Sequence, residues 1–410
     1  MPVTWQQLYA DRTAGMRASD IREILKVTAR PDIISLAGGL PAPELFPVDE
    51  YRRAFEWVLE ADGAQALQYG PSEGYLPLRR LLAERLSRFG MPCGPDDLLV
   101  TNGSQQALDL MGKVFLNPGD AVLVETPTYL GALQAFNQYQ ATYAIVPMDE
   151  DGMRVDEVER VLAQRSARAP IKFIYALPNF QNPTGRSMSL ERRRRLVELA
   201  SHYGVPIVED DPYGELRYEG AALPTLKSLD TEGLVIYLGT FSKILAPGFR
   251  LGWMLAGPEV MEVLMHGKQP SDLHTGMAQQ MATYEVAKGG FVDQHVERIK
   301  DFYRERRDVM LRSIQEHFPA DAHYTRPAGG LFVWAELPRD IDTRGLLLEA
   351  IEEKVAFVPG QGFHADGSGT NTMRLNFSNV PPEQLQTGVQ RLGHAIQRRL
   401  DRTRTASATA

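Results

Sequence analysis

The sequence predicts an α/β protein in which a large, mostly parallel sheet flanked by helices is joined to a smaller α+β domain. The chain of 410 residues exceeds what one hydrophobic core usually supports, so we expect two domains. Between about residues 95 and 257, apolar runs such as AVLVETP and IKFIYALP alternate with helical patterns such as SQQALDLMGKVFL, as in parallel sheets covered on both faces. After about residue 290, long charged helices precede the strand-like runs GGLFVWAELP, VAFVPG and TMRLNFS, which indicate the second domain.

The chain is expected to divide into an N-terminal arm that joins the small domain (1–40), a large domain (41–290), a small C-terminal domain (291–401) and a disordered tail (402–410). The arm carries one short helical pattern, ASDIREILKVT, which a proline soon ends. The tail contains TRTASATA and has almost nothing to bury. The arginine run at 192–195 is interpreted as a solvated helix face.

Composition argues against several classes of protein. A net charge of -8 and a pI near 5.6 provide no general attraction for nucleic acid or for anionic membranes. The N-terminus resembles no secretory signal, and no apolar run approaches the roughly 18 residues of a membrane span. The single cysteine, Cys93, excludes an internal disulfide and a cysteine metal cluster. We therefore expect a cytoplasmic protein without a metal site.

The unusual residues follow the predicted strands, at the carboxyl ends where open α/β sheets bind ligands. Gly103, Ser104 and Gln105 open a helix after DLLVTN, so free amides and a hydroxyl can bind an anion such as phosphate. NFQNPTG follows IKFIYALP, DDPYGE follows VPIVE, and TFSK, with Arg250 beyond it, follows LVIYLG. Each piece alone is weak evidence, because Gly103 with Ser104 fits an ordinary helix cap, NPTG an ordinary turn, and Asp210 with Asp211 the start of a loop. Lys243 of TFSK ends a run typical of a buried strand, so it is either paired with an anion or not an ammonium when it works.

Together and in this order, these stretches resemble the pyridoxal-phosphate enzymes of the aspartate-aminotransferase fold type, fold type I, and specifically the class I aminotransferases. The matching stretches include SLAGGLPAPELFP, LQYGPSEGYLPLR, PNFQNPTG, VEDDPYGEL, FSKILAPGFRLGW, RPAGGLFVW and MRLNFS. Within that family the chain looks most like the 2-aminoadipate aminotransferases, from about residue 14 to 400. The resemblance implies pyridoxal 5'-phosphate as cofactor, amino acids and 2-oxo acids as substrates, and a homodimer with shared active sites.

The resemblance also implies roles for single residues. Lys243 would form a Schiff base with the cofactor aldehyde and then act as general base at the substrate Cα. Asp210 would keep the pyridine nitrogen protonated, with Asp211 as a competing assignment that strand alternation places on the other face. Tyr213 and Asn182 would hydrogen-bond the phenolic oxygen of the cofactor.

Further carry-overs concern the phosphate and the ring. The residues expected to bind the phosphate are Arg250, Thr240, Ser242, Ser104 and Gln105. Tyr129 matches the aromatic residue that stacks on the pyridine ring, although packing on the core is the other interpretation. Tyr69 matches a tyrosine that reaches the phosphate and the substrate from the neighbouring subunit.

Substrate recognition is expected from both ends of the chain. Arg374 in MRLNFS matches the arginine that binds the α-carboxylate, for which a bidentate guanidinium is suited. Gly39 would let the backbone approach the same carboxylate. Asn182 is also expected to contact the substrate. Arg22, in the N-terminal arm, falls where the resembling enzymes place an arginine against the distal carboxylate of 2-aminoadipate or glutamate; an ordinary exposed arginine is the alternative. Leucine and aromatic or kynurenine-like substrates also fit the resemblance.

These expectations combine into an aminotransferase that moves the α-amino group of an L-amino acid to 2-oxoglutarate in a ping-pong cycle. A decarboxylase, lyase or synthase on the same fold is the first alternative, because the cofactor motifs do not separate these reactions. An aminotransferase-like sensor module is the second, although no helix-turn-helix pattern precedes the fold. Neither a dinucleotide-binding fingerprint after the first strand nor a P-loop motif occurs in the sequence.

Overall fold

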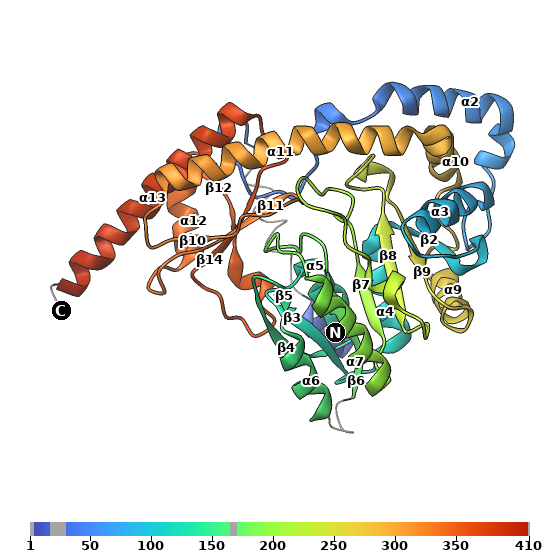
Figure 1. Ribbon diagram of the computed structural model, residues 1–410, viewed down its shortest axis with the longest axis horizontal. Helices are drawn as coiled ribbons and strands as arrows, with labels where there is room; N and C mark the ends of the chain where they lie inside the picture. Colours follow the sequence, from blue (N-terminus) through green and yellow to red (C-terminus); the bar gives the residue numbers. More distant parts are fainter. Residues whose placement is uncertain (1–3, 17–29, 165–169, 409–410) are drawn as a thin grey trace.

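The computed structural model describes residues 4–16, 30–164 and 170–408, and it confirms the predicted fold class (Figure 1). The central sheet has the strand order β2-β9-β8-β7-β6-β3-β4-β5. Its strands from β8 through β7, β6 and β3 to β4 are parallel, whereas β9 is antiparallel to both neighbours and β5 is antiparallel to β4. The strand bounds are β2 (Leu98–Asn102), β3 (Ala121–Thr126), β4 (Thr142–Asp149), β5 (Gly152–Met153), β6 (Ile171–Ala176), β7 (Ile207–Asp210), β8 (Val235–Thr240) and β9 (Leu251–Leu255).

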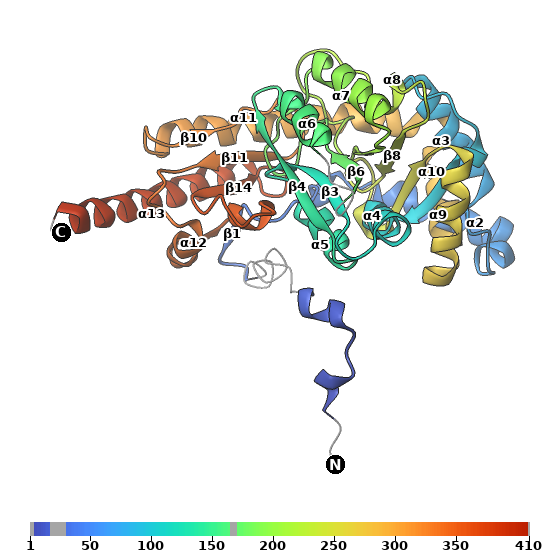
Figure 2. The same cartoon turned by 90° about the horizontal axis from the view of Figure 1, so that it is seen from below.

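Both faces of the sheet are covered because its strands are apolar on both sides. In β6, Phe173 and Tyr175 belong to the core under α4, α5 and α9, whereas Ile174 and Ala176 belong to the core under α6 and α7. Figure 2 shows the sheet between these two layers. The helix bounds are α4 (Gly103–Phe115), α5 (Leu130–Asn137), α6 (Val155–Ala163), α7 (Leu190–Tyr203), α8 (Leu226–Leu229) and α9 (Pro258–Asp272).

The C-terminal part builds a small antiparallel sheet of order β10-β11-β14-β13, and a separate parallel pair joins β1 to β12. The long helix α11 extends along both parts of the molecule (Figure 1). The strands of this part are β1 (Ile34–Ser35), β10 (His323–Tyr324), β11 (Phe332–Glu336), β12 (Val355–Ala356), β13 (Val358–Pro359) and β14 (Thr372–Asn376). The remaining helices are α2 (Val48–Ala66), α3 (Leu76–Arg88), α10 (Met277–Ala287), α11 (Phe291–His317), α12 (Thr343–Glu352) and α13 (Pro382–Ala408).

Three expectations concern the helix of the N-terminal arm, the domain limits and the C-terminal tail. The short helix expected in the arm lies outside the described residues, and the proposed domain limits stay a prediction. The disordered tail also stays a prediction; the structure extends α13 to Ala408. Within the described ranges, no helix is both long enough and apolar enough to span a membrane.

The arginine run on α7 is not a fully solvated face. Arg193 is completely buried, and its guanidinium donates hydrogen bonds to the carbonyls of Met188 (2.9 Å), Pro224 (2.9 Å) and Pro178 (2.8 Å), and to Asn179 Oδ1 (2.7 Å). A planar group with five donors suits this set of acceptors. Arg193 thereby fixes the loop that leaves the carboxyl end of β6.

We expect Arg193→Met to lower the free energy of unfolding by about 3 kcal/mol, since buried carbonyls left without donors cost about 1 to 3 kcal/mol each. The measurement is the urea midpoint of the cofactor-free protein. Arg194→Met is the matched control, because that neighbouring arginine is exposed. Equal midpoints for the two variants would contradict the structural role of Arg193.

Candidate functional site

A cavity of about 260 Å³ lies where the carboxyl edge of the central sheet meets the small sheet. It brings together all the predicted site residues that the structure describes, except Tyr69. The predicted residues that line it are Gly39, Ser104, Gln105, Tyr129, Asn182, Asp210, Tyr213, Thr240, Ser242, Lys243, Arg250 and Arg374. The sheet explains this convergence, because parallel strands end at one edge and the antiparallel β9 begins there, just after Arg250.

One end of the cavity is built for an anion. Gly103 opens α4 with φ of +70°, and a Cβ there would lie 2.4 Å from Arg250 Nη2, so glycine allows the guanidinium to approach the helix N-terminus. Ser104 Oγ is buried and has no hydrogen-bond partner among the described residues. The Gln105 side chain, in contrast to Ser104, has a partner: it donates a hydrogen bond to the Gly131 carbonyl at 3.0 Å. The free amides of the helix start, a hydroxyl and a guanidinium therefore face one space.

The turn after β8 adds two buried hydroxyls to this end. Thr240 Oγ1 lies 2.9 Å from Ser242 Oγ and 2.9 Å from the Leu251 carbonyl, and it accepts a hydrogen bond from the Ser242 amide at 3.1 Å. These bonds hold the tight turn that leads into Lys243.

Lys243 is partly buried, and no described carboxylate pairs with it. Its Nζ donates to the Gly39 carbonyl at 2.9 Å. Burial lowers the pKa of Lys243 to about 8, helped by the positive charges of Arg374 and Arg250. A substantial fraction of the amine is therefore neutral near physiological pH.

The two acidic residues at the end of β7 face different spaces. Asp210 lines the cavity and accepts a hydrogen bond from the Tyr175 hydroxyl at Oδ2 (2.8 Å), whereas its buried Oδ1 has no described partner. Burial raises the pKa of Asp210 to about 7, with a smaller contribution from the charge of Asp211. Asp211 accepts from Asn179 Nδ2 (3.0 Å) and from the Tyr237 hydroxyl (3.3 Å), and it lines a separate hollow. Of this pair, only Asp210 lines the candidate site.

The opposite end of the cavity is built around a buried guanidinium. Arg374, on β14, donates to Asn182 Oδ1 (2.9 Å) and to the Ala37 carbonyl (2.9 Å), while its Nε has no described partner. It lies over the rings of Phe332 and Phe363, at 4.3 and 5.1 Å from their centroids. Burial lowers the pKa of Arg374 to about 10, so it remains cationic at neutral pH.

Three predicted residues complete the lining between these ends. Tyr213 is almost fully buried and packs edge-on against Phe332, with centroids 5.8 Å apart. Burial raises the pKa of both Tyr213 and Tyr129, so both hydroxyls stay protonated. Gly39 passes so close to Phe332 that a Cβ would lie 2.8 Å from the ring. Its backbone can therefore approach the cavity only as glycine.

Tyr69 does not line the cavity of its own chain. Tyr69 is 79% exposed and touches His274 edge-on, with ring centroids 5.9 Å apart. Arg22 lies outside the described residues. The roles expected for these two residues stay predictions.

Sequence reasoning missed several contributors to the site. Tyr175, Phe332 and Phe363 were not singled out, and Arg193 was misassigned. Tyr175 carried a signal, since a hydroxyl within the apolar strand IKFIYALP needs a buried partner. For the two phenylalanines no signal existed, because nothing in a local apolar pattern separates a ring under a guanidinium from an ordinary core ring.

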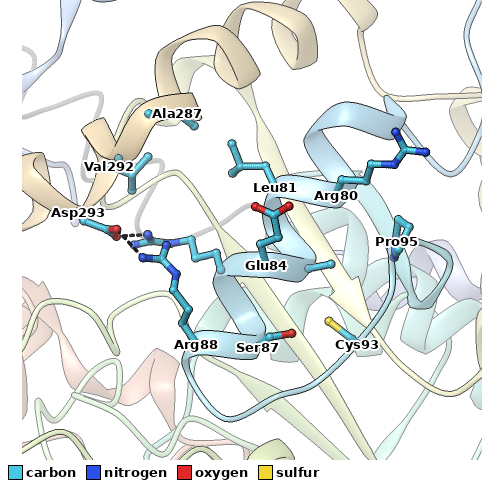
Figure 3. A pocket seen from close by; sticks show the side chains of 14 residues that line it. Arg80, Leu81, Glu84, Ser87, Arg88, Cys93, Pro95, Ala287, Val292 and Asp293 are labelled. Atoms are coloured by element: carbon cyan, nitrogen blue, oxygen red, sulfur yellow. Dashed lines mark hydrogen bonds and ion pairs between the residues drawn. The ribbon is translucent and has the colours of Figure 1, made fainter.

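A second and larger hollow, of about 700 Å³, lies between α3 and the start of α11 (Figure 3). Three of its charged groups pair with one another, since Arg85 and Arg88 both contact Asp293. Cys93 lines this hollow, and burial with the nearby charge of Asp97 raises the pKa of its thiol to about 11. The thiol is therefore protonated at neutral pH and a poor nucleophile. This hollow is a weaker candidate than the cavity around Lys243.

Comparison with known proteins gives consistent matches over nearly the whole chain. Residues 31–392 match the family described as aminotransferase class I and II. The chain is 48% identical to aromatic-amino-acid aminotransferase 1 of Thermococcus litoralis, over 96% of this chain and 94% of that protein. It is 46% identical to a solved kynurenine aminotransferase of Pyrococcus horikoshii, with a TM-score of 0.93 and coverage of 97% of this chain and 98% of that one. It is also 44% identical to the α-aminoadipate aminotransferase LysN of Thermus thermophilus, solved with N-(5'-phosphopyridoxyl)-L-leucine, with a TM-score of 0.91 over 97% of this chain and 100% of that one.

The amine of Lys243 is expected to titrate near pH 8 in the cofactor-free protein. Because the neutral amine is the reactive form, its labelling by an amine-specific reagent should rise with a midpoint at pH about 8. The midpoint for an ordinary lysine is about 10.4. Arg374→Gln should move the midpoint upward, since it removes a charge that disfavours the ammonium. Peptide mass spectrometry measures the labelling, and a midpoint equal to that of surface lysines would contradict the described environment.

Proposed function

Because the chain belongs to the class I and II aminotransferases, we propose that it moves the α-amino group of an L-amino acid to 2-oxoglutarate, with pyridoxal 5'-phosphate as its cofactor. One observation carries this proposal. The cavity around the Lys243 amine is lined by three residues whose buried polar atoms lack described partners, namely Ser104 Oγ, Asp210 Oδ1 and Arg374 Nε. A hydroxyl at a helix N-terminus suits a phosphate, a carboxylate oxygen suits a protonated ring nitrogen, and a guanidinium suits a carboxylate.

The residues present fit this cofactor in type and order. Ser104, Arg250, Thr240 and Ser242 would bind its phosphate, together with the amides at the start of α4 and Gln105. Asp210 would hold the proton on the ring nitrogen, and Tyr129 would cover the ring. Tyr213 and Asn182 would hydrogen-bond the phenolic oxygen, and Lys243 would carry the group through its amine.

The chemistry divides between the cofactor and the chain. When bound, pyridoxal phosphate draws electrons from the substrate Cα and stores the amino group between the two halves of a ping-pong cycle. Once the substrate amino group has displaced it from the cofactor, the Lys243 amine would take the proton from the substrate Cα and pass it to the cofactor's aldehyde carbon, C4′. A base with a pKa near the working pH is effective in this role, typically contributing about 10²- to 10⁴-fold, and the lowered pKa of Lys243 meets that requirement. Burial of the site keeps bulk water from competing for the proton.

Arg374 is proposed to bind the substrate α-carboxylate. Its planar fork matches a carboxylate, and its position over two aromatic rings fixes the plane of that fork. Burial strengthens the contact because little water screens it.

The proposed range of amino donors is broad. The relatives described above are named for aromatic amino acids, for kynurenine and for α-aminoadipate. We include 2-aminoadipate and glutamate, with Arg22 reading the distal carboxylate, and also leucine and aromatic amino acids. The cytoplasmic location stays a prediction from the sequence.

The proposed assembly is a homodimer whose active sites are shared. Tyr69 is 79% exposed and is absent from the lining of its own cavity, and such an exposed aromatic residue suits burial by a second copy. It would reach the phosphate bound in the partner subunit.

Lys243→Ala should abolish the visible absorption of the purified protein and amino transfer to 2-oxoglutarate, because the amine that carries the cofactor is lost. A panel of amino donors, assayed with and without 2-oxoglutarate, measures the reaction type and range. Product formation that needs no amino acceptor would instead indicate a decarboxylase or lyase. Unchanged absorption and turnover in Lys243→Ala would contradict the assignment.

Mixed dimers test the shared site. Tyr69→Ala alone should weaken cofactor binding about tenfold, the loss expected for one charge-assisted hydrogen bond. A dimer that pairs a Tyr69→Ala chain with a Lys243→Ala chain has one intact site only if Tyr69 acts across the interface. We expect that dimer to show about half of the wild-type activity with wild-type cofactor affinity. Affinity as weak as that of Tyr69→Ala would place Tyr69 in its own site or outside both.

A further inference from the structure

Asp210 is held by one side chain from the neighbouring strand. Tyr175, on β6, pairs with Val208 of β7 in the sheet register, so its ring lies on the same face as Asp210, two residues further along. Its hydroxyl reaches the sheet edge and donates to Asp210 Oδ2 at 2.8 Å. The other oxygen, Oδ1, is buried on a residue that lines the cavity and lacks a described partner. One oxygen is thus fixed, and the other remains available to a ligand.

The environment otherwise favours a neutral carboxyl. Asp210 is 2% exposed and forms no ion pair with a described cation, and burial raises its pKa. The neighbouring Asp211 acts in the same direction. The Tyr175 hydrogen bond lowers the pKa of Asp210, since a donor to the carboxylate stabilises its charged form. Other titratable groups that act on Asp210 or Tyr175 are Tyr129, Tyr213 and Glu125.

We propose that Tyr175 is a positioning residue of the aminotransferase reaction, which favours the ionised form of Asp210 and directs its Oδ1 to the cofactor ring nitrogen. This inference rests on the proposed function, in which Asp210 holds the proton on that nitrogen. Burial keeps the pKa of Tyr175 well above its usual value, so its hydroxyl remains a donor at every working pH. The ring itself packs edge-on against Phe136, with centroids 5.7 Å apart, and a phenylalanine would retain that packing.

The experiment compares Tyr175→Phe, Asp210→Asn and the double variant. Tyr139→Phe is the matched control, because its hydroxyl donates to Asp109 at 2.9 Å and Tyr139 does not line the cavity. The readouts are the dissociation constant for pyridoxal phosphate as a function of pH, and the rate of Cα proton removal from a deuterated amino donor. The thermal midpoint of each cofactor-free variant reports on folding.

Tyr175→Phe should weaken cofactor binding and slow proton removal, each by about tenfold. Loss of the hydrogen bond should raise the pKa of Asp210. As the solution is acidified, the variant should therefore begin to lose cofactor affinity at a higher pH than the wild type does. KM for the amino donor should change little, and Tyr139→Phe should match the wild type. The double variant should be no worse than Asp210→Asn alone, because Tyr175 acts through that carboxylate.

Two outcomes would overturn the proposal in distinguishable ways. If Tyr175→Phe worsens Asp210→Asn by the same factor as it worsens the wild type, or changes only the thermal midpoint, Tyr175 is structural. If Asp210→Asn itself retains wild-type affinity and rate, the ring-nitrogen assignment in the proposed function fails, and the role of Tyr175 fails with it.

Discussion

The site depends on holding a lysine amine where no described carboxylate pairs with it. The Lys243 ammonium is disfavoured by burial and by the positive charges of Arg374 and Arg250, while the Gly39 carbonyl provides a hydrogen bond that serves either protonation state. Such an arrangement is unfavourable for folding, so the surrounding structure must fix it. It is fixed by a sheet edge at which several strands end together, and by a second sheet that closes over that edge.

At the end of β7, one acidic residue lines the cavity and the next one is hydrogen-bonded to the structure behind it. Asp211 turns away from the cavity and is fully engaged by Asn179 and Tyr237. Asn179 also accepts a hydrogen bond from Arg193, so a buried polar network anchors the loop behind the site. Asp210, one residue earlier, keeps one oxygen without a described partner. Two adjacent carboxyls on one strand therefore have opposite surroundings, as strand alternation requires.

The strands and helices of the large sheet could be predicted from local sequence patterns, whereas the roles of the site residues came from the family resemblance, because each motif alone also fits a cap or a turn. A glycine and a serine after a strand, or a lysine after a buried run, can be located by pattern. Arg193 could not, because four consecutive arginines on a helix look alike until tertiary packing buries one of them. To predict the contact of Tyr175 with Asp210, the register between β6 and β7 must be known, and no single strand sequence contains it.

Arg374 connects three separate stretches of the chain, since it lies on β14 and donates both to Asn182 beyond β6 and to the Ala37 carbonyl. In the proposed function, an incoming carboxylate would bind to the same guanidinium, through its Nε, which has no described partner, and the remaining hydrogens of its terminal nitrogens. If Arg374 binds the substrate as proposed, amino-acid affinity and the fit of the small sheet against the large one would be coupled, and each would bias the other by the same free energy. Substitutions far from the cavity that loosen this contact will consequently alter substrate affinity without touching the substrate.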